Sequence, residues 1–79
     1  MDWRDYIEQR PDVMLGKPVL KGTRLTVELI LERLADGNTV EEVLAAHPRL
    51  TPEHVRAALA FAAASLSADE TVFVSEAAG

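Results

Sequence analysis

Residues 39–53 read TVEEVLAAHPRLTPE, and this stretch decides the fold. Thr39 and Glu42 have the spacing of a capping box, in which each side chain accepts a hydrogen bond from the other residue's backbone N–H, so a helix begins after Thr39. Pro48 cannot continue that helix. Thr51 followed by Pro52 is typical of a second helix start. The stretch predicts two helices joined by the tight turn 48–50, a helix-turn-helix motif. An αα-hairpin that only packs is the alternative.

The neighbouring segments add a helix on the N-terminal side and a long apolar helix on the C-terminal side. Upstream, Thr26 is an N-cap candidate, Gly37 with Asn38 provides a stop, and apolar residues recur between them at helical spacing: Val27, Ile30, Leu31 and Leu34. The stripe predicted to be buried on the second helix is Val40, Val43 and Leu44. On the third helix it is Val55, Ala58, Leu59, Ala62 and Leu66.

The segment before residue 27 carries strand signals. Residues 18–20 and 23–26 flank Lys21-Gly22, a two-residue turn that predicts a small β-hairpin at the end of an extended arm. The predicted fold is therefore mainly α: a three-helix helix-turn-helix domain, homeodomain-like or winged-helix-like, with a short N-terminal β-hairpin arm. We expect an arm at 1–26, a helical core at 27–67 and a C-terminal tail at 68–79.

Composition excludes several classes of protein. The 79 residues form one domain at most and contain no cysteine, which excludes disulfides and thiolate metal sites. No apolar run has the roughly 20 residues of a membrane helix, and the first residues do not resemble a signal peptide, so we expect a soluble, cytoplasmic protein. The net charge of −5 argues against indiscriminate nucleic-acid binding, although residues 10–56 carry seven basic and seven acidic side chains.

Two groups of polar residues are candidates for DNA contact. One is the turn and first helical turn of the motif, where a recognition helix meets the major groove: Arg49, Thr51, His54 and Arg56. The other surrounds the hairpin and could neutralise phosphates: Lys17, Lys21 and Arg24. The alternative for the second group is a solvated rim that protects an exposed strand edge.

The third helix is apolar on more than one face. Residues outside its inner stripe are also apolar: Ala57, Ala60, Phe61 and Ala64. A helix that is apolar all round needs two covering surfaces, so we predict a homodimer through these residues; the alternative is that the N-terminal arm, with Trp3 and Tyr6, folds over the helix. The tail contains Val72, Phe73 and Val74, which could add as a strand to a partner or form a disordered end.

The sequence offers no catalytic constellation. The two histidines, His47 and His54, lie on different predicted helices, and no third metal ligand accompanies them. We therefore expect no enzyme activity, no metal, no cofactor, no small-molecule substrate and no membrane association.

Residues 16–27, GKPVLKGTRLTV, resemble the core of the domain-of-unknown-function family four-thirty-three (DUF433). Residues 37–43, 48–51 and 55–62 resemble its later blocks, so that the resemblance spans about residues 6–64. It implies a helix-turn-helix domain after a short β element. It also implies an antitoxin that represses its own operon and is paired with a PIN-like ribonuclease toxin. Within the shared core, Arg24 would either pair with a helix carboxylate or contact DNA.

Two hypotheses follow for function. The first is an antitoxin that binds operator DNA through its helix-turn-helix and binds its PIN-like toxin through the tail or arm. The second is a protein-interaction module that sequesters a partner without binding DNA.

Overall fold

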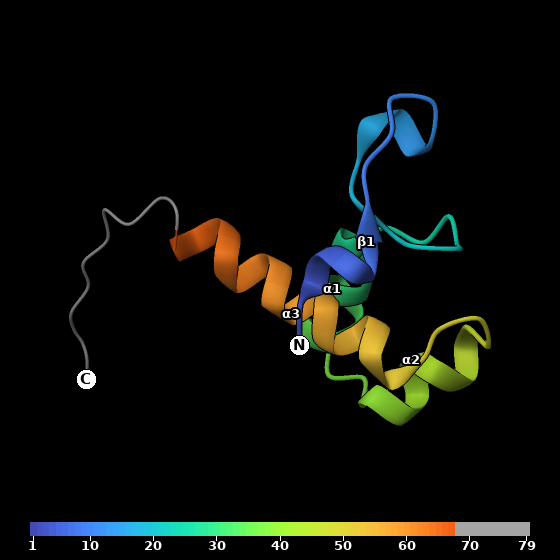
Figure 1. The fold of residues 1–79 in the computed structure, drawn as a ribbon. Coiled ribbons are helices and arrows are strands. Elements are labelled where there is room, and N and C mark those ends of the chain that lie inside the picture. Colours follow the sequence, from blue (N-terminus) through green and yellow to red (C-terminus); the bar gives the residue numbers. More distant parts are fainter. Residues whose placement is uncertain (68–79) are drawn as a thin grey trace.

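The computed structural model describes residues 1–67, which form a mainly helical domain with one two-stranded sheet (Figure 1). This confirms the predicted fold class. The elements in chain order are the 3₁₀ turn η1 (Trp3–Asp5), β1 (Ile7–Glu8), η2 (Met14–Gly16), β2 (Val19–Leu20), α1 (Val27–Ala35), α2 (Val40–Ala46) and α3 (Pro52–Ser67). No helix within residues 1–67 combines the length and the apolar character needed to cross a membrane.

The helices begin where the capping residues predict. The Thr26 hydroxyl accepts a hydrogen bond from the Leu29 backbone N–H at 3.1 Å at the start of α1. At the start of α2 the Glu42 backbone N–H donates to Thr39 Oγ1 at 3.1 Å, and the Thr39 N–H donates to Glu42 Oε1 at 2.8 Å. Both helix starts could be predicted from neighbouring residues, because each capping hydrogen bond joins residues only three positions apart.

A short antiparallel hairpin is present, but its strands are β1 and β2, and they are not the predicted pair on either side of the Lys21-Gly22 turn. β2 pairs antiparallel with β1, with Ile7 opposite Leu20, whereas the predicted partner 23–26 contributes a single bridge between Val19 and Thr26. The Thr23 hydroxyl donates to the Leu20 carbonyl at 2.7 Å and accepts from the Leu25 N–H at 3.0 Å, which bends the chain. Thr26 is then already the N-cap of α1. Too few residues remain for a strand.

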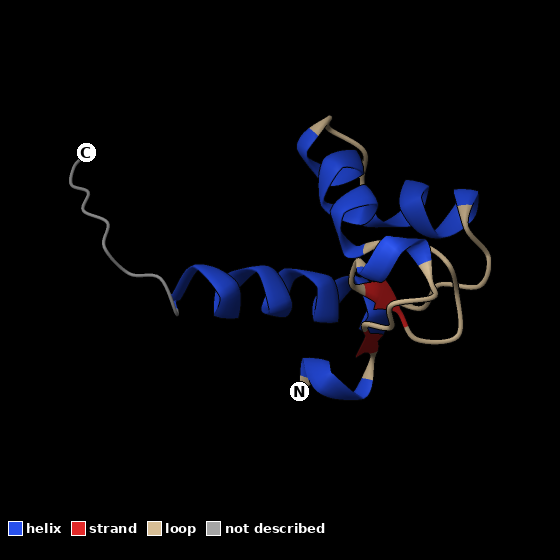
Figure 2. Cartoon of the chain, turned by 90° about the horizontal axis from the view of Figure 1, so that it is seen from above, coloured by secondary structure: helices blue, strands red, loops and turns tan. Residues whose placement is uncertain are grey.

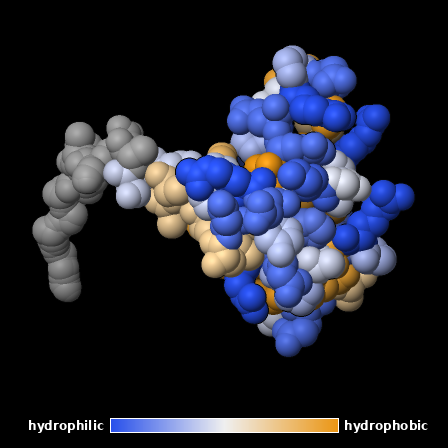
Figure 3. All heavy atoms as spheres, viewed as in Figure 1, coloured by the Kyte–Doolittle hydropathy of each residue, from blue (hydrophilic) through white to orange (hydrophobic). Residues whose placement is uncertain are grey.

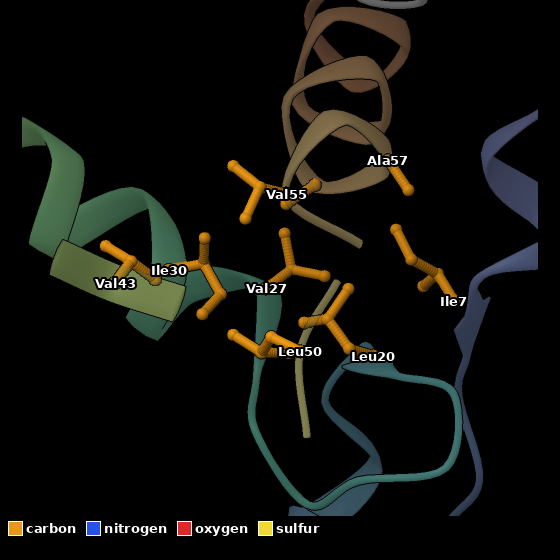
Figure 4. Packing of buried hydrophobic residues seen from close by; sticks show 9 residues of the cluster. Ile7, Leu20, Val27, Ile30, Val43, Leu50, Val55 and Ala57 are labelled. Atoms are coloured by element: carbon orange, nitrogen blue, oxygen red, sulfur yellow. The ribbon is translucent and has the colours of Figure 1, made fainter. Parts of the chain in front are cut away.

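The core draws on the arm as well as on the helices. Its buried cluster is shown in Figure 4 and consists of Ile7, Leu20, Val27, Ile30, Val43, Leu50, Val55, Ala57 and Ala58. Leu20 and Ile30 are completely buried. The arm is thus part of the same hydrophobic core as the helices, and burial of its strands supplies the support that an isolated hairpin lacks.

Helix α3 is buried in its first half and projects from the domain in its second half (Figures 1 and 2). Its buried face is rotated from the predicted stripe, because η1 and β1 pack on it in addition to α1. Ala57 is fully buried and faces Ile7 (Figure 4), so its predicted role as a partner-contacting residue is wrong. Leu59 and Leu66, expected inside, are 49% and 74% exposed. Val40 on α2, also expected inside, is 39% exposed.

The arm covers part of the second apolar face of α3. The rings of Trp3 and Phe61 meet edge to face, with centroids 4.9 Å apart and an interplanar angle of 80°. This is the alternative in which the N-terminal arm folds over the helix. It leaves Phe61 half-buried, and beyond it Ala64 is exposed.

Candidate nucleic-acid interface

A cleft of about 720 Å³ separates the turn after β2 from the loop between α2 and α3. Three arginines from three separate segments line it: Arg10 after β1, Arg24 in the turn, and Arg49 in the α2–α3 loop. The other lining residues are Glu8, Val13, Gly22, Thr23, Leu25, His47 and Pro48. With Glu8 as the one carboxylate among the lining residues, the cleft favours an anion.

The three arginine side chains are exposed, and their guanidinium groups make few contacts within residues 1–67. Arg49 Nη1 donates to the Gly22 carbonyl at a long 3.4 Å. Arg10 Nε lies 3.9 Å from the Asp12 carboxylate, with both side chains more than half exposed, so this pair is weak. Arg24 makes no ion pair with any of residues 1–67, and its predicted pairing with a helix carboxylate is not found in this part of the chain. These guanidinium groups keep donors free for phosphate oxygens.

His54 joins the start of α3 to the turn that carries Arg24. Thr51 and His54 form a capping box with histidine in the place of the usual glutamate. The Thr51 backbone N–H donates to His54 Nδ1 at 3.1 Å, and the His54 N–H lies 3.3 Å from Thr51 Oγ1. His54 Nε2 then lies 3.2 Å from the Lys21 carbonyl, thirty-three residues earlier.

These contacts assign the proton on the His54 ring. Since Nδ1 accepts from Thr51, the neutral ring carries its hydrogen on Nε2 and donates it to the Lys21 carbonyl. The Tyr6 ring packs edge-on at a centroid distance of 6.0 Å. Both ring nitrogens are therefore used within the chain, and His54 positions the turn relative to α3.

The structure separates the predicted DNA-binding residues into groups. Arg24 and Arg49 share the cleft. Arg56 is exposed on α3. Lys17 lies elsewhere: its Nζ donates to Glu28 Oε1 at 3.1 Å, and it lines a different depression, beside η2 and α1.

The remaining predicted site residues either make structural contacts or lie outside the described residues. The Lys21 side chain is exposed, while the Lys21 carbonyl accepts a hydrogen bond from His54 Nε2. Thr51 caps α3. The tail residues Val72, Phe73 and Val74 lie outside the described residues.

Arg10 was missed by the sequence reasoning. No motif surrounds it, and the pairing of β1 with β2 is what brings it to the cleft. The only available signal was the apolar Ile7 three residues earlier, which marks a short strand but does not name its partner.

The described residues do not assemble a metal site. Residues 1–67 contain no group of three His, Asp or Glu side chains placed to hold an ion. The backbone N–H of Arg4 donates to Asp2 and lowers the pKa of that carboxyl below its ordinary value. Asp2 caps η1 and does not line the cleft.

Residues 7–62 match the family model described as "Protein of unknown function (DUF433)". The chain belongs to the DUF433 family. It is 37% identical over 62 residues to the uncharacterized protein y4eO of Sinorhizobium fredii (strain NBRC 101917 / NGR234). That match covers 78% of this chain but 28% of the relative, which is therefore much longer.

A solved structure shares the fold. The crystal structure of a DUF433 member protein from Anabaena variabilis ATCC 29413 superposes with a TM-score of 0.76 at 26% sequence identity. The match covers 82% of this chain and 64% of the Anabaena chain. The two chains therefore share the overall fold across the matched part of this chain.

Proposed function

We propose that this DUF433 domain is a non-enzymatic, DNA-binding regulator of antitoxin type that acts in the cytoplasm. The observation that carries the proposal is the convergence of Arg10, Arg24 and Arg49 in one cleft beside the start of α3. In this proposal the three guanidinium groups contact backbone phosphates, and Arg56 with the Lys21 side chain extends the contact along the operator. The first turn of α3 then faces the major groove.

The local charge of the cleft allows DNA binding although the whole chain is acidic. The chain has a net charge of −5, but the cleft carries three arginines against one carboxylate. Each phosphate contacted by a basic side chain releases counterions and adds about 0.9 to the slope of log affinity against log salt. The three arginines of each bound copy therefore contribute about −3 to this slope, and contacts by Arg56 and Lys21 add to it.

The antitoxin role also needs a protein partner. We propose a homodimer through the apolar surface on the second half of α3 that includes Ala60 and Ala64, and a cognate PIN-like ribonuclease toxin as a second partner. Figure 3 shows apolar, tan surface along this part of α3, next to a largely hydrophilic body. Contiguous exposed apolar surface is typical of interaction sites, and a two-fold dimer suits paired half-sites on an operator.

A second candidate function is a protein-interaction module that sequesters its partner without binding DNA. The overall acidity favours it, because a net charge of −5 opposes association with DNA, which is also negatively charged.

Fluorescence anisotropy with a labelled duplex from upstream of the coding region separates the two functions. We expect salt-dependent binding that weakens about three- to tenfold in Arg24→Gln or Arg49→Gln, with the salt slope falling by about 1 in each. Arg33→Gln is the matched control, because Arg33 is exposed on α1 and does not line the cleft. Absence of binding at about 50 mM salt would favour the protein-interaction module, and equal weakening by all three variants would contradict the cleft as the DNA interface.

A further inference from the structure

A second depression, separate from the arginine cleft, runs between α1 and the projecting half of α3. It has a volume of about 540 Å³ and an almost entirely apolar lining. The lining residues are Pro18, Val27, Glu28, Leu31, Glu32, Ala35, Phe61, Ala62, Ser65 and Leu66. We call it the α1–α3 groove. Leu66 at its outer end is 74% exposed, so apolar surface there meets water in the chain as described.

The rim of the α1–α3 groove is negative. Its charged lining residues, Glu28 and Glu32, are both acidic. Glu28 forms an ion pair with Lys17 at 3.1 Å, but both side chains are more than half exposed, so the pair neutralises Glu28 only in part. Glu32 forms no ion pair with any of residues 1–67. The last turn of α3 contains no basic residue, so the helix dipole adds negative partial charge at the other end of the groove.

We propose that the α1–α3 groove binds a cationic amphipathic helix of a protein partner. The proposal rests on the protein-partner half of the proposed function and is independent of DNA binding. Apolar side chains of the partner helix would lie over Leu31, Ala62 and Leu66, while its lysines or arginines would meet Glu32 and the carbonyl end of α3. This is the helix-in-groove mode of recognition, in which the apolar stripe supplies affinity and the flanking charge supplies selectivity.

Charge disfavours the other occupants. Residues 68–79 of the chain contain Asp69, Glu70 and Glu76 and no basic residue. A second copy of the chain carries a net charge of −5, and its residues 57–67 contain no lysine or arginine. The tail would bring more negative charge toward Glu32, and neither occupant offers a basic side chain that would neutralise it.

Binding can be followed through the single tryptophan of the chain. Trp3 packs against Phe61, which lines the groove, so occupancy changes the surroundings of the indole ring. The probes are three synthetic 18-residue peptides without tryptophan: an amphipathic Leu/Lys helix, the same pattern with Leu/Glu, and the Leu/Lys composition in a non-amphipathic order. We expect the amphipathic Leu/Lys helix to bind at least about tenfold more tightly than either of the others.

Paired variants of the full-length chain test the location. Glu32→Lys should weaken binding of the Leu/Lys helix by about three- to tenfold, whereas Glu41→Lys makes the same charge change on α2 outside the groove and should leave it unchanged. Leu66→Ser should weaken binding, and Leu59→Ser should not, because Leu59 is exposed on α3 but does not line the groove.

Several results would overturn the proposal. Equal weakening by Glu32→Lys and Glu41→Lys would mean that the peptide follows overall charge. Tighter binding by Phe73→Ser would mean that the tail occupies the groove, and dimerisation that Leu66→Ser abolishes would mean that a second copy does. Arg24→Gln changes the arginine cleft and not the α1–α3 groove, so it should leave peptide binding intact. Failure of the groove proposal is therefore distinguishable from failure of DNA binding.

Discussion

Replacing His54 tests the contact that joins the start of α3 to the turn after β2. His54→Ala removes the side chain that caps the Thr51 N–H and the hydrogen bond to the Lys21 carbonyl. A net hydrogen bond contributes about 0.5–1.5 kcal/mol and an N-terminal cap about 1 kcal/mol, so the free energy of unfolding should fall by about 2 kcal/mol. For a domain of this size that corresponds to a decrease in Tm of about 8–16 °C.

His54→Gln separates the two contacts. Glutamine is a normal partner in a capping box and can accept from the Thr51 N–H, but it lacks the ring nitrogen that reaches Lys21. We expect it to cost about 1 kcal/mol, half the effect of alanine. It should also weaken DNA binding although no cationic side chain is lost, because the turn carrying Arg24 is no longer held against α3.

Urea denaturation at fixed protein concentration, followed by far-UV circular dichroism and Trp3 fluorescence, measures both effects. A free energy of unfolding for His54→Ala within about 0.5 kcal/mol of that of the unsubstituted chain would contradict the stabilising role of His54. Equal losses of stability in His54→Gln and His54→Ala would show that the cap contributes nothing. Asn38→Ala provides a comparison, because Asn38 Nδ2 donates a single exposed hydrogen bond to the Arg33 carbonyl.

Four further substitutions test backbone strain and packing by the same urea titration. Gly22→Ala should cost about 1 kcal/mol, because Gly22 has φ +85° with no atom within 4 Å of an added Cβ; an unchanged midpoint would mean that the turn adapts. Leu15→Gly should stabilise the chain by about 0.5 kcal/mol, because Leu15 has φ +58° and is 94% exposed; a loss of stability would show that its side chain is covered in solution. Ile30→Ala should cost about 2–5 kcal/mol, whereas Leu66→Ala should stay within about 0.5 kcal/mol; similar costs at the two positions would contradict the burial described.

The sequence identified several residues of the candidate site, but it did not predict how they are arranged relative to one another. Arg24 and Arg49 were both candidates for DNA contact from the sequence, yet nothing local indicated that they line the same cleft. His54 was expected to face DNA, and the contacts of its two ring nitrogens became visible only when Lys21 and Thr51 could be placed beside it.

The sequence by itself determined where the helices begin and end. Thr26, Thr39 and Thr51 cap helices through hydrogen bonds that span three residues, and Gly37 takes the positive φ of +98° that follows α1. Such signals are readable because the interacting groups are neighbours along the chain.

Only the tertiary structure decided which surfaces those elements share. It paired Ile7–Glu8 with Val19–Leu20, brought Arg10 to the arginine cleft, and placed Ala57 inside while leaving Leu59 outside. The physical reason is that an apolar helix such as α3 offers several equivalent faces, so its orientation depends on which distant segments, here η1 and β1, pack against it.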